Sequence, residues 1–176
     1  NYGDTMTSQA KPHTAPTKRF DRELFNANDP QTRESAKKLL PPKLKEILGL
    51  DEEPVLEDNL EAYGIDLICP KHNLSVEVET KHGWGSGKFQ WDDMHIPRRK
   101  FIYTELNGDV FFVVFNTDRT QAGIMTKDSV KKERVVNKFN RLSRLHEDYI
   151  SVPVEEIIWA VSYTHLRAPR RVRISG

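Results

Sequence analysis

The sequence is poor in the features that define several classes of protein. It has one cysteine, Cys69, among 176 residues, which excludes a disulfide framework and a zinc site built from cysteines. No apolar run approaches the roughly 20 residues that a helix needs to cross a bilayer, and no segment has the pattern of a signal peptide. The P-loop motif and the G-x-S-x-G motif of serine hydrolases are also missing. We therefore expect a cytoplasmic protein with no membrane partner.

An excess of charge of one sign is also missing, because 27 Lys and Arg stand against 26 Asp and Glu. The segment 162–176 departs from this balance, with four arginines and no acid. One interpretation is a basic tail that binds nucleic acid. The other is that the segment is non-native, because SYTHLRA resembles the translation of a sequencing-library adapter. Residues 1–17 are polar, rich in threonine and aperiodic, which predicts a disordered N-terminal tail. We expect a single domain over residues 18–161.

Hydrophobic periodicity and chain breakers predict an α/β (α+β) domain, in which a mixed central sheet is flanked by helices. The predicted helices are 31–40, ended by Pro41 and Pro42, then 43–48, ended by Gly49, a helix opened by Pro97, and part of 127–149. The predicted strands are 65–69 and 74–81, joined by a turn at 70–73, then a strand at 110–116 buried on both faces, its partner at 122–125, and a final apolar element at 157–161.

The strand LSVEVETK carries charged residues on one face. Its alternation places Glu77, Glu79 and Lys81 on that face and the valines on the other. If the turn joins residue 69 to residue 74, Asp66 lies opposite Glu77 and diagonal to Glu79 on the same face. Three carboxylates and one ammonium would then share a patch, where a like-charge pair ~4 Å apart costs roughly 4 kcal/mol at an effective dielectric of about 20. Proton uptake or a divalent cation would offset this cost, and oxygen ligands suit Mg²⁺.

These residues, in this order and spacing, resemble the PD-(D/E)XK nuclease superfamily. The family pattern is an acid at the end of one strand and acid-x-Lys on the next. Here Asp66 is followed, after twelve intervening residues, by Glu79-Thr80-Lys81, and Ile65 stands where the family name has proline. The spacing is similar to that of archaeal Holliday-junction resolvases and several restriction endonucleases. The string YGIDL…VEVETKHGW…IPRRK looks like that of phage and bacterial nuclease-like proteins in this group.

The resemblance covers roughly residues 20–116 and implies a restriction-endonuclease-like fold with a catalytic hairpin. It implies metal-dependent hydrolysis of DNA phosphodiester bonds, in a bacterial, archaeal or phage-infected cell. Asp66 and Glu79 would ligate Mg²⁺ together with the backbone carbonyl of Thr80, and Mn²⁺ would be able to substitute by similar chemistry. Lys81 would orient or activate the attacking water and offset charge on the phosphate.

Many members of the superfamily also have a glutamate on the first helix. Glu34 is the candidate in this sequence, and Asp29 and Glu23 are the alternatives. Glu77 is either a further ligand or a neighbour of the site. DNA is the expected partner, and a homodimer is an open expectation because nucleases of this type often pair to cut both strands.

Basic residues after the hairpin are candidates for contacting DNA. Arg98, Arg99 and Lys100 follow Pro97, where cations oppose the dipole of a helix and would suit a bound phosphate. In nucleases of the superfamily that the sequence resembles, a basic residue on this helix often completes the active site, and Arg99 or Lys100 would take this role. The alternative is a solvated basic face. A second basic group has the same two interpretations: Lys127, Lys131, Lys132, Arg134 and Lys138.

Aromatic residues in the loop after the hairpin have two interpretations. Trp84, Phe89 and Trp91 either stack on DNA bases or form a small core beneath the loop. Two functions other than a nuclease also remain open. One is a nucleic-acid-binding module without turnover, and the other is a structural domain in which EVETK is only a solvated strand face with ion pairs.

Overall fold

The computed structural model describes residues 22–162, with side chains from Pro30 onward. One long helix, α2 (Arg22–Leu48), precedes all the strands. The strands are β1 (Glu57–Asp58), β2 (Leu67–Cys69), β3 (Leu74–Thr80), β4 (Asp93–Pro97), β5 (Asp109–Phe115), β6 (Gln121–Thr126), β7 (Val135–Asn140), β8 (Leu145–Pro153) and β9 (Ile158–Val161). Short 3₁₀ helices connect them: η2 (Pro70–His72), η3 (Arg98–Glu105), η4 (Lys132–Arg134) and η5 (Val154–Glu156).

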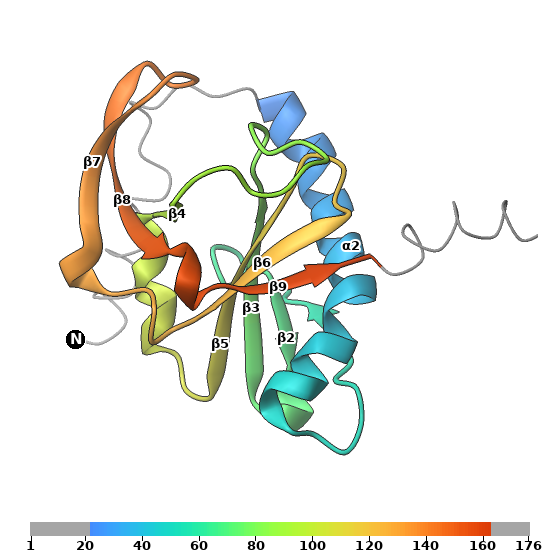
Figure 1. The fold of residues 1–176 in the computed structure, drawn as a ribbon. Helices are drawn as coiled ribbons and strands as arrows, with labels where there is room; N and C mark the ends of the chain where they lie inside the picture. The colour runs from blue at the N-terminus through green and yellow to red at the C-terminus, as the bar shows by residue number, and fades with distance from the viewer. Residues whose placement is uncertain (1–21, 163–176) are drawn as a thin grey trace, which may run out of the picture.

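The strands form two sheets, so the fold is mixed α+β. The larger sheet has six strands in the order β1-β2-β3-β5-β6-β9, and only its β3–β5 pair is parallel. The smaller sheet is antiparallel, in the order β4-β8-β7, and lies across from α2 in Figure 1. Within the described part of the chain, no helix is both long and apolar enough to cross a membrane.

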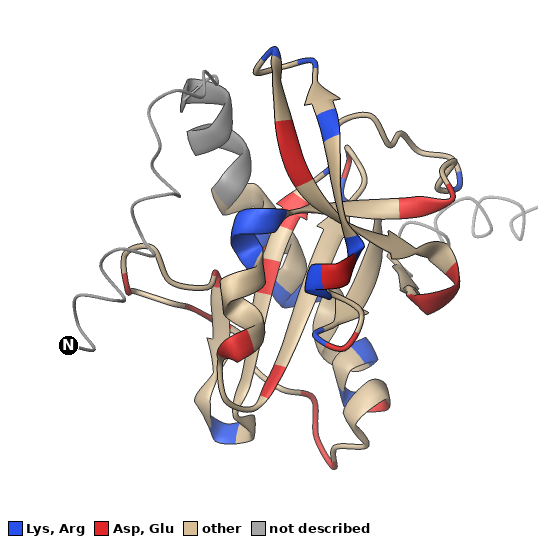
Figure 2. Ribbon diagram, turned by 90° about the vertical axis from the view of Figure 1, so that its left-hand side faces the viewer, with Lys and Arg blue, Asp and Glu red and all other residues tan. Residues whose placement is uncertain are grey.

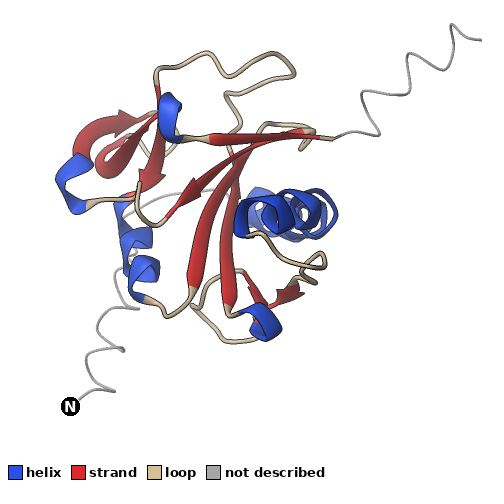
Figure 3. Ribbon diagram, turned by 60° about the horizontal axis from the view of Figure 1, so that its bottom comes forward, coloured by secondary structure: helices blue, strands red, loops and turns tan. Residues whose placement is uncertain are grey.

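The large sheet separates two hydrophobic cores. On one face α2 packs Leu40 and Leu44 against Val76 and Val78 of β3. On the other face the small sheet packs against the alternate residues of β5: Phe112 and Val114 meet Met94, Ile96 and Ile150. The crossover from β3 to β5 carries β4 and η3 on the face away from α2, as Figure 3 shows. The expected strand buried on both faces is confirmed, since β5 is buried from Val110 to Phe115.

The prediction of two helices separated by Pro41 and Pro42 is wrong, because α2 continues through both prolines to Leu48. A proline inside a helix removes a hydrogen bond and costs about 3 kcal/mol. Burial offsets this cost, because Leu40 and Leu44 flank the prolines and are both fully buried, and each such side chain contributes about 1.5–3 kcal/mol. The expected end at Gly49 is confirmed by its φ of 66°.

The predicted hairpin and its register are confirmed. Leu67 pairs with Val76 and Cys69 with Leu74, so the turn has the expected length. Asn73 ends the turn in the left-handed region, with φ 50°, a conformation that asparagine tolerates better than most residues. Asp66 immediately precedes Leu67, so it is aligned with Glu77, as the sequence predicted.

Two predicted helices are corrected. The segment after Pro97 is the 3₁₀ helix η3, in which aromatic and β-branched residues follow the basic start and lower the α-helical propensity. The segment 127–149 contains no α-helix. It forms η4, β7 and most of β8, because Val135, Val136 and Phe139 favour a strand and β8 pairs along its inner half with β4.

Gly108 ties the hairpin turn to the start of β5, and its substitution tests this junction. Gly108 has φ 83°, and a Cβ atom there would lie 2.2 Å from the backbone oxygen of Asn73. We expect Gly108→Ala to lower the free energy of unfolding by at least about 2 kcal/mol, measured by urea denaturation. Gly87→Ala is the matched control, because nothing lies within 4 Å of its Cβ position. Equal stability of the two variants would contradict this role.

Candidate active site

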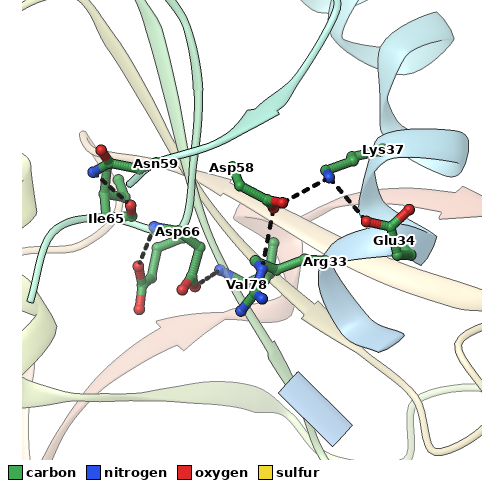
Figure 4. A network of polar contacts seen from close by, with 9 residues as sticks. Arg33, Glu34, Lys37, Asp58, Asn59, Ile65, Asp66 and Val78 are labelled. Atoms are coloured by element: carbon green, nitrogen blue, oxygen red, sulfur yellow. Dashed lines mark hydrogen bonds and ion pairs between the residues drawn. The ribbon is translucent and has the colours of Figure 1, made fainter. Parts of the chain in front are cut away.

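The charged face of β3 meets the end of β2 on the side of the sheet away from α2. The Asp66 backbone N–H donates to Glu77 Oε1 at 3.2 Å. In the other direction, the Val78 backbone N–H donates to Asp66 Oδ2 at 3.0 Å, as Figure 4 shows. These two bonds fix Asp66 beside Glu77 where regular pairing of β2 ends. The predicted placement of Asp66 on the hairpin is therefore confirmed.

A buried lysine lies at the centre of the carboxylates. Lys100 of η3 extends its Nζ to Glu79 Oε1 at 2.6 Å and to Glu77 Oε2 at 3.3 Å. The whole residue is only 7% exposed. The sequence predicted a carboxylate patch that needs a proton or a divalent ion. In the structure, Lys100 already supplies one compensating charge.

The pKa values follow from this burial and pairing. Burial opposes the charged form of Lys100, but Glu79 and Glu77 overcome it and hold the pKa of Lys100 above its usual value. Burial is also the largest effect on Glu77. The negative charge of Asp66 and a hydrogen bond with its side chain act in the same direction, against Lys100, and the pKa of Glu77 rises to about 8. Proton uptake by Glu77 is therefore a second way in which the repulsion among the carboxylates is reduced, as the charge pattern predicted.

Lys81 follows Glu79 by two residues and is half-buried. Its Nζ lies 4.8 Å from the centre of the Trp91 ring, a cation–π arrangement. Burial lowers the pKa of Lys81, Glu79 opposes this change, and Lys138 reinforces it. An amine whose pKa is lowered exchanges a proton more readily near neutral pH than an ordinary lysine.

The small sheet presents a polar face to the same residues. Asp93 and His95 of β4 lie on the opposite side from Met94 and Ile96, which are buried. His95 Nε2 is 3.4 Å from Asp93 Oδ1. Burial lowers the pKa of His95, and Lys138 and Lys81 lower it further while Asp93 opposes them. The polar face therefore lies next to Lys81.

Two tyrosines also border the carboxylates. Burial raises the pKa of Tyr103 to about 12, and the negative charges of Glu77 and Asp66 add to this effect. Burial likewise raises the pKa of Tyr149, to which Glu147 and Glu79 contribute. Neither these tyrosines nor His95 were among the site residues predicted from the sequence. The period of two in Asp93-Met94-His95 is a signal that could have found the histidine, whereas the tyrosines have no local signal.

The predicted first-helix acid is not brought to the carboxylates. Thr32 Oγ1 reaches Thr80 Oγ1 at 2.8 Å, so this part of α2 contacts the face of β3 opposite Glu79. Glu34 pairs instead with Lys37 at 2.8 Å, and Lys37 also binds Asp58 at 3.1 Å, as Figure 4 shows. The reason is that α2 covers the other side of the sheet. The alternatives Asp29 and Glu23 lie in the part of α2 whose side chains are outside the described residues.

The predicted substrate-binding residues have different outcomes. Trp84 is fully buried in the second core and donates from Nε1 to the Gly87 carbonyl at 3.0 Å, so base stacking by Trp84 is corrected to core packing. Lys100 is engaged by two carboxylates rather than exposed to a phosphate. Arg98 and Arg99 are exposed at the start of η3, where their contact with DNA remains a prediction.

The donor set fits a magnesium ion only in part. Asp66 and Glu79 offer carboxylate oxygens, which Mg²⁺ prefers. Among the described residues, no group of three or more His, Cys, Asp and Glu side chains is arranged to hold a metal ion. Two carboxylates suit Mg²⁺ because this ion commonly keeps several waters and binds a substrate phosphate. They do not suit an ion that needs a cage made wholly of protein ligands.

Comparison with known proteins identifies no family for the chain. Neither a family model nor a curated protein matches its sequence. A function for this chain is therefore inferred from the placement of Asp66, Glu77, Glu79, Lys81 and Lys100.

The raised pKa of Glu77 predicts a pH dependence of stability. The folded state holds this proton up to about pH 8, whereas the unfolded chain loses it near pH 4.3. Since the folded state binds more protons in this window, the free energy of unfolding falls as pH rises through it. Relative to Glu77→Gln, the wild type should lose on the order of a few kcal/mol between pH 5 and pH 8, measured by urea denaturation in EDTA. Glu57→Gln, at an exposed strand position, is the control, and parallel profiles of wild type and Glu77→Gln would contradict the assignment.

Proposed function

We propose that the protein is a metal-dependent DNA endonuclease that hydrolyses phosphodiester bonds on a restriction-endonuclease-like fold. The observation that carries this proposal is the register of the β2–β3 hairpin. It aligns Asp66 with Glu77, next to Glu79 on the same strand face, and Lys81 follows on that face. This order and spacing are those of the PD-(D/E)XK pattern.

Asp66 and Glu79, with the carbonyl of Thr80, are the residues that would hold Mg²⁺ or Mn²⁺. Such an ion polarises a phosphoryl oxygen and lowers the pKa of a bound water. The chain itself supplies orientation, because the Val78 N–H holds Asp66 and the Lys100 ammonium holds Glu79. Lys100 is therefore a positioning residue, because its ammonium holds the Glu79 side chain in place.

Lys81 would act on the attacking water and on the developing charge of the phosphate. Its lowered pKa supports proton exchange with water, and its ammonium form stabilises negative charge that grows in the transition state. Arg98 and Arg99, which are exposed at the start of η3, would hold the DNA backbone. A homodimer would allow cleavage of both strands.

A nucleic-acid-binding module without turnover is the second candidate. One observation favours it: the Lys100 ammonium already occupies Glu79 Oε1 at 2.6 Å. If that pair persists on the DNA, Glu79 has less charge to offer a cation, and Asp66 alone would bind Mg²⁺ weakly. Cleavage separates the two candidates.

Replacement of Lys81 tests turnover. Lys81→Ala should lower the cleavage rate a hundred- to a thousandfold, because a preorganised charge in the transition state is worth about 2.7–4 kcal/mol. DNA affinity should change little, since Lys81 is one cation among many. The assay uses labelled plasmid and linear, flapped and branched duplexes with Mg²⁺ or Mn²⁺. Lys88→Ala, at an exposed position in the loop after β3, should cut as the wild type does.

The same assay has outcomes against the proposal. Pure wild-type protein that binds DNA but cuts no substrate with either ion would favour the binding module. Calorimetry adds a metal test: equal Mg²⁺ binding by the wild type and an Asp66→Asn, Glu79→Gln double variant would contradict the metal site. Glu34→Gln is the control for this titration, because Glu34 pairs with Lys37 on the other face of the sheet.

A further inference from the structure

The β7–β8 hairpin extends beyond the rest of the small sheet. Strand β4 pairs only with Tyr149–Pro153 of β8, whereas β7 pairs with β8 out to Leu145. Residues 137–148, here called the arm, therefore form a two-stranded projection. Figure 2 shows it rising from the body of the molecule, with Lys and Arg at its tip.

Hydrogen bonds link the residues of the turn at the tip. The Asn140 side-chain oxygen accepts the backbone N–H of Leu142 at 2.9 Å, and the Asn140 carbonyl accepts that of Arg144 at 2.7 Å. The Ser143 hydroxyl donates to Glu147 at 2.6 Å. An isolated two-stranded hairpin is marginal in water, so these bonds stabilise the turn.

This turn exposes an apolar side chain between two cations. Leu142 is 80% exposed, and Phe139 on the arm is 54% exposed. Arg141 and Arg144 flank Leu142, and neither takes part in an ion pair of the described residues. A single exposed leucine is ordinary on a protein surface. A leucine at the tip of a projecting hairpin, beside two arginines that form no ion pair among the described residues, is instead suited to a ligand that has both anionic groups and an apolar interior.

The base of the arm lies beside the candidate active site. The charge of Lys138 acts on both Lys81 and His95. The Asn140 side chain donates to the Tyr149 hydroxyl at 3.0 Å. The negative charge of Glu79 in turn contributes to the raised pKa of Tyr149. A ligand that reaches from Glu79 to the tip of the arm would pass along this row of residues.

We propose that the arm binds duplex DNA whose base stack is interrupted, with Leu142 inserted at the interruption and Arg141 and Arg144 on the flanking phosphates. This inference rests on the proposed function, from which it takes DNA as the substrate. Apolar side chains inserted between bases must first unstack them. A bulge or a nick has already lost that stacking, so the arm selects it over continuous DNA.

Binding in EDTA tests the wedge without cleavage. The probes are fluorescent duplexes of about 30 base pairs, one continuous and one with a central bulge, followed by fluorescence anisotropy. The wild type should bind the bulged duplex about tenfold more tightly, which corresponds to one stacking step. Leu142→Ser should remove this preference and Leu142→Met should keep it. The control Leu60→Ser removes a leucine that is 95% exposed elsewhere and should keep the preference.

Salt dependence tests the two arginines. Arg141→Ala combined with Arg144→Asn should weaken binding of both duplexes and reduce the slope of log affinity against log salt by about two. Asparagine is used at position 144 because Arg144 has φ 61°. Lys38→Ala with Lys45→Ala, at exposed positions of α2, should leave the slope unchanged.

The possible outcomes distinguish failure of the proposal for the arm from failure of the proposed nuclease activity. Equal wild-type affinity for both duplexes, a preference retained by Leu142→Ser, or no binding of either duplex overturns the wedge. Leu142-dependent binding to phosphatidylglycerol vesicles, or a Leu142-dependent dimer in light scattering, without DNA preference, also overturns it. Leu142-dependent preference with no cleavage in Mg²⁺ supports the arm and overturns the nuclease. Cleavage of both duplexes in Mg²⁺ without any binding preference supports the nuclease and overturns the proposed role of the arm.

Discussion

The contact of Lys100 with Glu77 and Glu79 is the interaction on which the candidate site depends. A lysine this deeply buried is stable as a cation only beside negative charge, and the glutamates in turn need a cation to share one strand face. Because Lys100 comes from η3 and the glutamates from β3, their contact fixes the crossover helix against the sheet. The hairpin bonds at Asp66 then complete the carboxylate group.

This charged centre is possible because the sheet keeps the two sides of β3 apart. Val76 and Val78 face α2 in one apolar core, while Glu77 and Glu79 face η3. The small sheet then closes the polar side with His95 and Tyr149, which respond to the charges of the site. The chemistry that we propose, attack on a phosphodiester, would thus occur on the charged face of β3, opposite the apolar core that β3 shares with α2.

Local pattern was sufficient to predict the hairpin, its register and the shared face of Asp66, Glu77 and Glu79, because a strand has a side-chain period of two and the turn had an identifiable length. It was insufficient for residues that reach the site through tertiary packing. Lys100 was selected as a phosphate contact, and its pairing with two glutamates needed the β3–β5 crossover to be known. The segment 127–149 was assigned partly to helix because its pairing with β4 is not a local property.

The most direct test of the Lys100 contact is a double-mutant cycle on unfolding free energy, with Lys100→Met, Glu79→Gln and their combination. The matched control is the same cycle for the surface pair Lys43 and Glu46, whose charged atoms are 3.3 Å apart. We expect a coupling on the order of 2 kcal/mol or more for Lys100 and Glu79, against less than about 0.5 kcal/mol for the surface pair. Equal coupling in the two cycles would contradict a site organised around Lys100.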